Sequence, residues 1–96
     1  MKNQISISKT AKYSQLGKCC KKIDTVWFVL HGYGMLSEYF IKKFESILNE
    51  KTLVIAPEAT NRFYLGDNYS RVGASWMTKL NREEEINDNI LYLEKL

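Results

Sequence analysis

The chain has 96 residues, of which 45% are hydrophobic and 26% charged, with five glycines, one proline and two cysteines. This composition excludes a disordered chain, a collagen-like repeat and a disulfide-rich scaffold, and it is typical of an ordinary globular domain. A chain of this length has room for one small domain, so we expect a single domain over residues 1–96.

The net charge of +3 comes from the N-terminal part, since the first 24 residues hold six lysines and one acidic residue. These lysines lack the dense basic stripe and the neighbouring stacking groups of a nucleic-acid site, so we expect no nucleic-acid partner. The longest apolar run, residues 26–30, is too short to cross a bilayer, and we expect no membrane segment.

Cysteine and histidine usage argues against a disulfide or a metal centre. Cys19 and Cys20 are adjacent, which makes a bond between them strained, and His31 is the only histidine. Because the sequence has no zinc-ligand spacing, we expect no metal ion and no cofactor, and a reducing, cytoplasmic setting.

The N-terminal half predicts short strands followed by a buried one. Ile5 and Ile7, and then Ala11 and Tyr13, alternate with polar residues, which predicts two short antiparallel strands or one bent strand. Residues 25–30 are an unbroken β-branched and aromatic run. Such a run predicts a central strand that is covered on both faces.

A helix and a second buried strand follow. Ser37 is in position to cap a helix whose apolar residues form one stripe, namely Phe40, Ile41, Phe44, Ile47 and Leu48. Residues 52–56 predict a buried strand that Pro57 ends. A strand, a helix and a strand in this order predict a parallel pair with a right-handed crossover.

The C-terminal part predicts a long loop and a final helix. Residues 58–79 have neither helical nor strand periodicity but are too apolar for a solvated linker, and long structured loops of this kind are usually functional. Asn81 followed by Glu84 predicts the start of a helix with one apolar face. The whole pattern predicts the α/β class, with parallel strands and helices on both faces of the sheet.

A glycine turn, HGYG at residues 31–34, follows the first buried strand. Ligands of open parallel sheets bind outside the carboxyl ends of the strands, which is where this turn lies. Glycine-rich backbone there can direct an N–H group at a developing negative oxygen. The turn is not a dinucleotide-binding fingerprint, because the third glycine of G-x-G-x-x-G would fall at Ser37.

Three segments occur in an order that is typical of one enzyme superfamily. Residues 26–34 (VWFVLHGYG) look like a third strand with its oxyanion turn, residues 55–59 (IAPEA) like the end of the next strand, and residues 73–77 (GASWM) like a Trp-bearing loop. Together they resemble the phospholipase/carboxylesterase branch of the α/β-hydrolases, which includes acyl-protein thioesterases. The resemblance covers residues 24–96 and implies the N-terminal half of an α/β-hydrolase sheet, and thus an incomplete domain.

The resemblance implies a role for each residue of the turn. The N–H group of Tyr33 would supply one of two oxyanion-hole donors, the other coming from the residue after the nucleophile. Gly32 and Gly34 would shape the turn, and His31 would brace it through its ring nitrogens. His31 would not be the general base, because the family's catalytic histidine follows the nucleophile in the chain.

By the same resemblance, three aromatic residues would line the pocket for the acyl group: Trp76, Phe63 and Tyr64. A large flat apolar wall beside an oxyanion hole suits an acyl chain. The alternative is that these side chains only cover the sheet edge and complete the core.

The family's catalytic residues are missing from the chain. It has no G-x-S-x-G nucleophile elbow, and residues 73–77 fail that pattern because Met77 stands at the final glycine. Ser37, Ser70 and the two cysteines have no neighbouring base to activate them. We interpret Glu58 and Asp67 as loop acids and residues 83–85 as a solvated helix start.

Two functional hypotheses follow. In the first, the chain is the N-terminal part of a serine esterase or thioesterase that acts on a small-molecule carboxylester, lysophospholipid-type ester or thioester. Its catalytic serine, acid and histidine would lie beyond Leu96, and the 96-residue chain would be inactive alone. In the second, the chain is a non-catalytic binding or assembly module. The strand at 25–30 would then be an exposed apolar edge that pairs with a second copy or with a partner strand.

Overall fold

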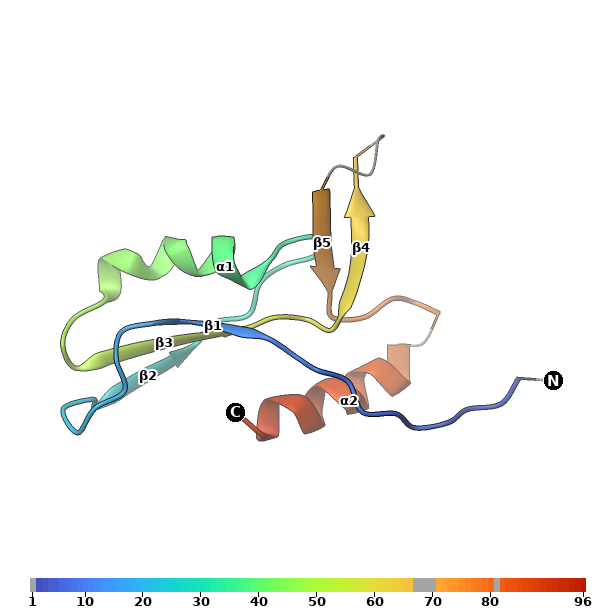
Figure 1. Cartoon of the computed structure of the whole chain (residues 1–96), viewed down its shortest axis with the longest axis horizontal. Helices are drawn as coiled ribbons and strands as arrows, with labels where there is room; N and C mark the ends of the chain where they lie inside the picture. Colours follow the sequence, from blue (N-terminus) through green and yellow to red (C-terminus); the bar gives the residue numbers. More distant parts are fainter. Residues whose placement is uncertain (1, 67–70, 81) are drawn as a thin grey trace.

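The computed structural model describes residues 2–66, 71–80 and 82–96 and shows a mixed α/β fold (Figure 1). Its main sheet has three strands, β1 (Tyr13–Leu16), β2 (Thr25–Phe28) and β3 (Thr52–Pro57), in the order β1-β3-β2. Strand β3 pairs antiparallel with β1 and parallel with β2. The predicted parallel pair is therefore confirmed, and it is limited to β2 and β3 among the described strands.

Strand β3 is the centre of the fold. All six of its residues are buried, because it has a neighbouring strand on each side and its apolar run supplies both faces. Val54 and Ala56 form the core with Val29 and Ile41. The sequence predicted this strand correctly.

Strand β2 lies at the edge of the sheet, which corrects the prediction of a central strand covered on both faces. All four of its residues are exposed, and Val26, Trp27 and Phe28 are each 46–55% exposed. An apolar run indicates burial only where another element covers the strand, and here β3 is the one strand that pairs with β2 among the described residues. The run therefore forms an exposed apolar edge, as the assembly hypothesis expected.

One face of the sheet is covered by α1 (Ser37–Phe40), which continues as the 3-10 helix η1 (Ile41–Ile47). The prediction of one continuous helix is corrected, since its stripe is only partly buried: Phe40, Ile41 and Phe44 pack on the core, whereas Ile47 and Leu48 are exposed. Ser37 is the first helical residue rather than the cap.

Residues 58–79 contain a β-hairpin where the sequence predicted a long loop. Strands β4 (Asn61–Leu65) and β5 (Arg71–Ser75) pair antiparallel, and the hairpin extends away from the main sheet (Figure 1). Met35 makes an isolated bridge to Ala74 of β5. The hairpin thus contacts the segment that follows β2, where the glycine turn lies.

Helix α2 (Arg82–Glu94) matches the predicted final helix, but it buries none of its side chains. The expectation of helices on both faces of the sheet stays a prediction. Asn81, the predicted cap, and Asp67, the predicted loop acid, lie outside the described residues. None of the described helices is long and apolar enough to span a membrane.

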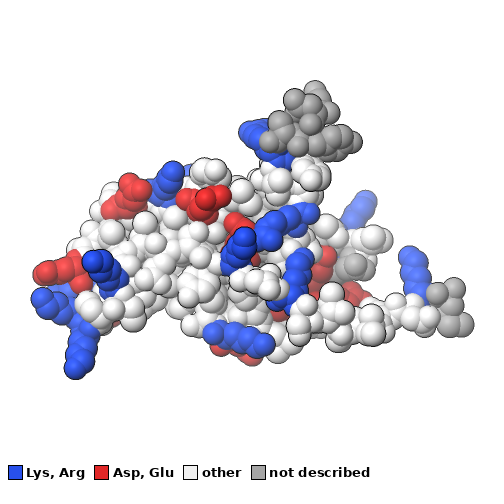
Figure 2. Space-filling model, in the orientation of Figure 1, with Lys and Arg blue, Asp and Glu red and all other residues white. Residues whose placement is uncertain are grey.

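The N-terminal segment is extended but forms no strand before Tyr13 in the part of the chain that is described. Ile5 and Ile7 are 88% and 80% exposed, so the first predicted strand is absent there. The segment runs beside α2 (Figure 1), where Gln4 donates a hydrogen bond to Glu84. Basic and acidic side chains are interspersed on the face shown in Figure 2.

Candidate functional site

The HGYG segment forms a tight turn at the carboxyl end of β2. The N–H group of Met35 donates to the carbonyl oxygen of Gly32 at 3.3 Å, and Gly34 has a φ of +76°. This geometry matches a type II β-turn with Tyr33 and Gly34 at its two central positions. A positive φ at the second central position favours glycine, which explains Gly34.

Strand β5 holds the turn from outside. The N–H group of Gly34 donates to the carbonyl oxygen of Ala74 at 2.9 Å, and the N–H group of Ala74 donates to that of Met35 at 3.1 Å. The two backbones are so close that a Cβ atom on Gly73 would lie 2.5 Å from the carbonyl oxygen of Gly34. A glycine at position 73 therefore permits this contact.

His31 is buried, with 3% of its surface exposed. The N–H group of Ala59 donates to its Nε2 atom at 3.0 Å, so Nε2 is an acceptor and the ring proton lies on Nδ1. Nδ1 donates to the carbonyl oxygen of Gly32 at 2.8 Å. Both ring nitrogens are thus engaged by backbone groups, and His31 is placed to brace the turn rather than to take a proton from a nucleophile.

Hydrogen bonds to the Gly32 carbonyl fix the direction of the next N–H group. Both His31 Nδ1 and the Met35 N–H group donate to this oxygen. The peptide bond to Tyr33 is trans, so the Tyr33 N–H group points away from the Gly32 oxygen. No acceptor for this N–H group is found within residues 2–66, 71–80 and 82–96. The turn therefore presents a backbone donor of fixed direction.

Trp76 contacts His31 through both its ring and its N–H group. The two rings stack with centroids 5.2 Å apart at 27°, and Trp76 Nε1 donates to the His31 carbonyl oxygen at 2.9 Å. On α2, Tyr92 stacks on Trp76 at 6.3 Å, and Asn89 donates to the Trp76 carbonyl oxygen at 2.7 Å. Trp76 therefore supports His31 and joins the end of β5 to α2.

The structure does not bring the three predicted pocket aromatics together on one wall. Phe63 packs against the ring of Tyr33, with centroids 5.0 Å apart. Tyr64 is the next residue of β4, so its side chain points to the opposite face of the hairpin, where it is 65% exposed. Trp76 contacts His31 instead. Of the three, Phe63 and Trp76 lie in contact with the HGYG segment.

Glu58 is a buried acid rather than the loop acid that the sequence predicted. It is 7% exposed, and its Oε1 atom accepts hydrogen bonds from the N–H group of Ser37 at 3.0 Å and from its hydroxyl at 3.2 Å. Its Oε2 atom accepts from Arg62 Nη2 at 2.7 Å and Nε at 3.2 Å. The carboxylate of Glu58 thus accepts the hydrogen bond of the first N–H group of α1. The sequence had predicted that Ser37 would cap this helix.

The electrostatics of Glu58 favour the ionised form. Burial raises the pKa of this carboxyl group, but the hydrogen bonds from Arg62 and Ser37 and the positive charge of Arg62 outweigh burial, so the pKa lies below its ordinary value. Sequence reasoning missed this group. The available signal was an acid directly after a buried strand, at the sheet edge where polar groups gather in α/β folds.

No serine or cysteine near the turn is arranged as a nucleophile among the described residues. Ser75 is buried and its hydroxyl donates to the carbonyl oxygen of Met77 at 2.8 Å, in agreement with its failure to match the elbow pattern. Cys19 and Cys20 are exposed and unbonded to each other. Within the described residues, no cluster of three or more potential metal ligands occurs. Ser70 lies outside them.

Comparison with known proteins gives no family assignment. No protein-family model matches the chain, and no curated protein matches it significantly. What the site can do must therefore be argued from its geometry. It offers one backbone N–H group of fixed direction near the carboxyl end of a parallel strand, in a turn that His31 braces with both ring nitrogens.

Proposed function

We propose that this chain carries the oxyanion-binding turn of a serine hydrolase of the α/β-hydrolase type, acting on carboxylesters or thioesters. The observation that carries the proposal is the Gly32 carbonyl, which accepts from both His31 Nδ1 and the Met35 N–H group and so directs the Tyr33 N–H group outward. A donor of fixed direction stabilises a tetrahedral oxyanion without reorganising during the reaction.

The position of the turn in the fold supports the same proposal. It follows β2, a strand parallel to the buried β3, and ligands in open α/β sheets bind at the carboxyl ends of such strands. The other edge of β2 is not paired with any described strand. That edge is where the resemblance to α/β-hydrolases puts the strand that bears the nucleophile.

In the proposed reaction, a serine attacks the ester or thioester carbonyl, and the resulting oxyanion accepts a hydrogen bond from the Tyr33 N–H group. A second donor follows the nucleophile, and water then hydrolyses the acyl-enzyme. The serine, its base and its acid come from residues other than these 96, because the sequence has no G-x-S-x-G elbow and both His31 nitrogens are engaged. His31 acts as a positioning residue.

Substitution of Tyr33 separates the role of the N–H group from that of the side chain. Proline suits the first central position of a type II turn, so Tyr33→Pro removes the donor and keeps the turn, whereas Tyr33→Ala keeps the donor. In the polypeptide encoded by the complete open reading frame that contains these residues, we expect Tyr33→Pro to lower kcat about 10²–10³-fold. Tyr33→Ala should lose far less, as measured with p-nitrophenyl butyrate.

Equal losses in the two variants would show that the side chain, not the N–H group, matters, and would contradict the oxyanion role. The isolated 96-residue chain provides a second check. It should neither hydrolyse the ester above background nor react with a fluorophosphonate probe. Reaction of either kind would show that the nucleophile lies within these residues.

A specific observation favours a second candidate, a binding or assembly module. The side chains of Val26, Trp27 and Phe28 are exposed along β2, as is that of Leu30 just after it, and no described strand pairs with the outer edge of β2. An apolar strand with unpaired backbone groups is a template for strand addition. A second copy would pair antiparallel across a two-fold axis and extend the sheet.

Light scattering and sedimentation of the 96-residue chain test this second candidate. Edge pairing predicts a dimer whose fraction rises with protein concentration over the micromolar range. A chain that stays monomeric across that range would contradict the assembly module and leave the hydrolase proposal unaffected, since that proposal has its own assay.

A further inference from the structure

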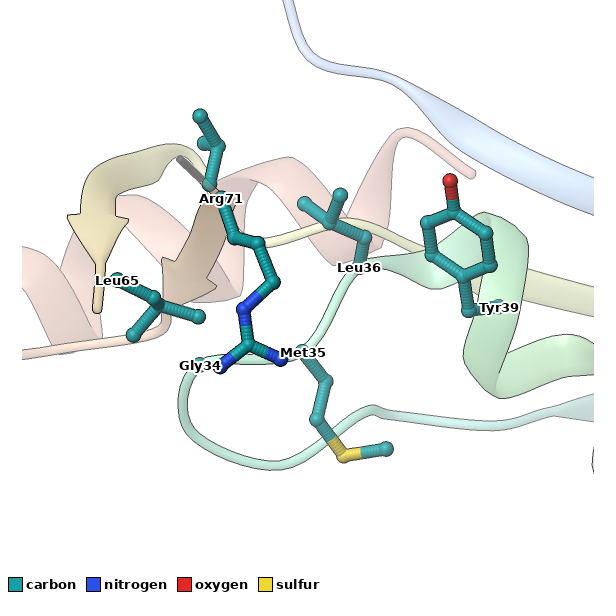
Figure 3. A pocket seen from close by; sticks show the side chains of 7 residues that line it. Gly34, Met35, Leu36, Tyr39, Leu65 and Arg71 are labelled. Carbon is teal, nitrogen blue, oxygen red and sulfur yellow. The ribbon is translucent and has the colours of Figure 1, made fainter. Parts of the chain in front are cut away.

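A pocket of about 550 Å³ lies between the segment that follows the glycine turn and the β4–β5 hairpin. Its walls are Met35, Leu36 and Tyr39 on one side and Leu65, Arg71 and Val72 on the other (Figure 3). This volume falls within the range of roughly 300–1,000 Å³ that is usual for small-molecule sites. The glycine turn itself contributes Gly34 to the lining.

Arg71 is the charged residue of this lining, and within the described residues it differs from Arg62 in its ion pairing. Arg62 pairs with Glu58 at 2.7 Å, whereas no ion pair of Arg71 is found in the described part of the chain. Figure 3 shows Arg71 extending from β5 across the pocket toward Gly34 and Met35. Its guanidinium group is therefore directed at the space beside the turn.

The described residues that line the pocket add apolar surface, and a lysine lies near one wall. No acidic residue is among the residues that line the pocket. The ammonium group of Lys42 lies 5.5 Å from the centre of the Tyr39 ring, at the α1 wall. The other walls are the aliphatic side chains of Met35, Leu36, Leu65 and Val72.

We propose that this pocket binds an amphipathic anion, namely a carboxylate or phosphate group on a short aliphatic stem, with the anionic group on Arg71. A guanidinium fork matches the two oxygens of either group, and the aliphatic walls cover the stem. The site thus selects anionic acyl compounds over neutral ones.

The inference deepens the proposed function and rests on it for the reaction. Gly34 lines the pocket and follows Tyr33 directly, so the two Cα atoms are about 3.8 Å apart. The pocket therefore lies next to the turn that carries the proposed oxyanion donor. The substrate class is an ester or thioester that carries a separate carboxylate or phosphate group.

Binding to the 96-residue chain tests the pocket without any hydrolysis, so this test can fail while the hydrolase proposal stands. The ligands are hexanoate, hexyl phosphate and the neutral 1-hexanol, titrated by calorimetry and by amide NMR shifts. We expect both anions to bind at least about tenfold more tightly than hexanol, because a guanidinium adds a charge-assisted hydrogen bond. Shifts should centre on Gly34, Met35 and Val72.

Three variants assign the affinity to the pocket. Arg71→Gln should weaken anion binding about tenfold and leave hexanol binding unchanged, whereas the matched Arg82→Gln, on the exposed start of α2, should change neither. Val72→Glu keeps Arg71 but puts a like charge beside the ligand and should also weaken anion binding. Circular dichroism establishes that each variant is folded.

The outcomes decide the inference. Equal affinity for the anions and hexanol, or full anion binding in both Arg71→Gln and Val72→Glu, would overturn it. If it holds, the tighter of the two anions identifies the ligand group, because hexanoate and hexyl phosphate carry stems of five and six carbons and differ chiefly in the headgroup.

Discussion

Two consecutive residues, Glu58 and Ala59, connect the glycine turn to the helix that follows it. The N–H group of Ala59 holds the ring of His31, and the carboxylate of Glu58 holds the N–H group and hydroxyl of Ser37. The turn and the start of α1 are thus both anchored to the end of β3. A change at Glu58 should therefore affect the whole molecule, not only its own surface.

Glu58→Gln should lower the free energy of unfolding at pH 7 by about 1–2 kcal/mol, because glutamine accepts from Ser37 but loses the charged contact to Arg62. The value is modest since Arg62 is partly solvated. Urea unfolding measures it, with the exposed Glu83→Gln as the matched control. An equal effect of the two substitutions would show that Glu58 has no special role.

The lowered pKa of Glu58 makes the free energy of unfolding depend on pH. Its pKa is lower in the folded chain than its ordinary value of 4.5, so its stabilising contribution is complete above that pH and is lost as the pH falls toward the lower, folded value. The difference between wild type and Glu58→Gln should therefore shrink below about pH 4.5. A difference that stays constant into acid would contradict the lowered pKa.

At the scale of elements, the turn depends on the hairpin. Gly34 and Met35 exchange backbone hydrogen bonds with Ala74, so β5 pairs with β4 on one side and with the segment after the turn on the other. The type II turn closes one hydrogen bond of its own, at 3.3 Å. Its rigidity therefore depends on the closeness of the β5 backbone, which Gly73 makes possible.

Gly73→Ala should destabilise the chain by about 1–3 kcal/mol, since its Cβ atom would lie 2.5 Å from the Gly34 carbonyl oxygen and backbone would have to move. Gly32→Ala is the matched control, because a Cβ atom there meets only the sulfur of Met35 at 3.5 Å. Urea unfolding compares the two. A larger loss for Gly32→Ala would contradict the close approach of β5 to the turn.

Sequence predicted the elements that depend on local pattern and missed those that depend on a partner. The apolar run of β3 and the repeat of α2 were sufficient to place both. The run of β2 predicted burial, yet no described element covers its outer edge. The hairpin was missed because Gly73 interrupts the alternation of β5, and the closeness it permits is visible only in three dimensions.

The residues of the site also fall into two groups, those placed by local sequence and those placed by distant partners. The glycine turn is local, so its two glycines could be predicted from four consecutive residues, whereas the brace by His31 came from the resemblance to α/β-hydrolases and uses the distant Ala59. The partners of Glu58 come from β4 and α1, and the pocket at Arg71 forms between α1 and the hairpin. The place of Glu58 after a buried strand is a local signal, but its partners and the walls of the pocket come from separate segments, which is why both arrangements were missed.

The whole molecule is open for its length. Its radius of gyration is 15.6 Å, and its extents are 54 × 32 × 19 Å. A compact domain of this size has a radius near 12.5 Å, to a rough approximation. Helices α1 and η1 cover one face of the main sheet, while α2 buries no side chain. The core is therefore small, and the exposed edge of β2 is an apolar feature that a second chain could cover.

Trp27→Lys should disrupt pairing at this edge. If the two-fold axis passes beside Trp27, the two Trp27 side chains lie opposite each other on one face, so lysine would replace buried apolar area with two like charges. Lysine is also the residue by which natural edge strands resist strand addition. We expect the dimer dissociation constant to rise at least about tenfold, as measured by sedimentation equilibrium. Leu91→Lys, on the exposed face of α2, is the matched control and should leave it unchanged, so equal weakening by both would place the contact away from β2.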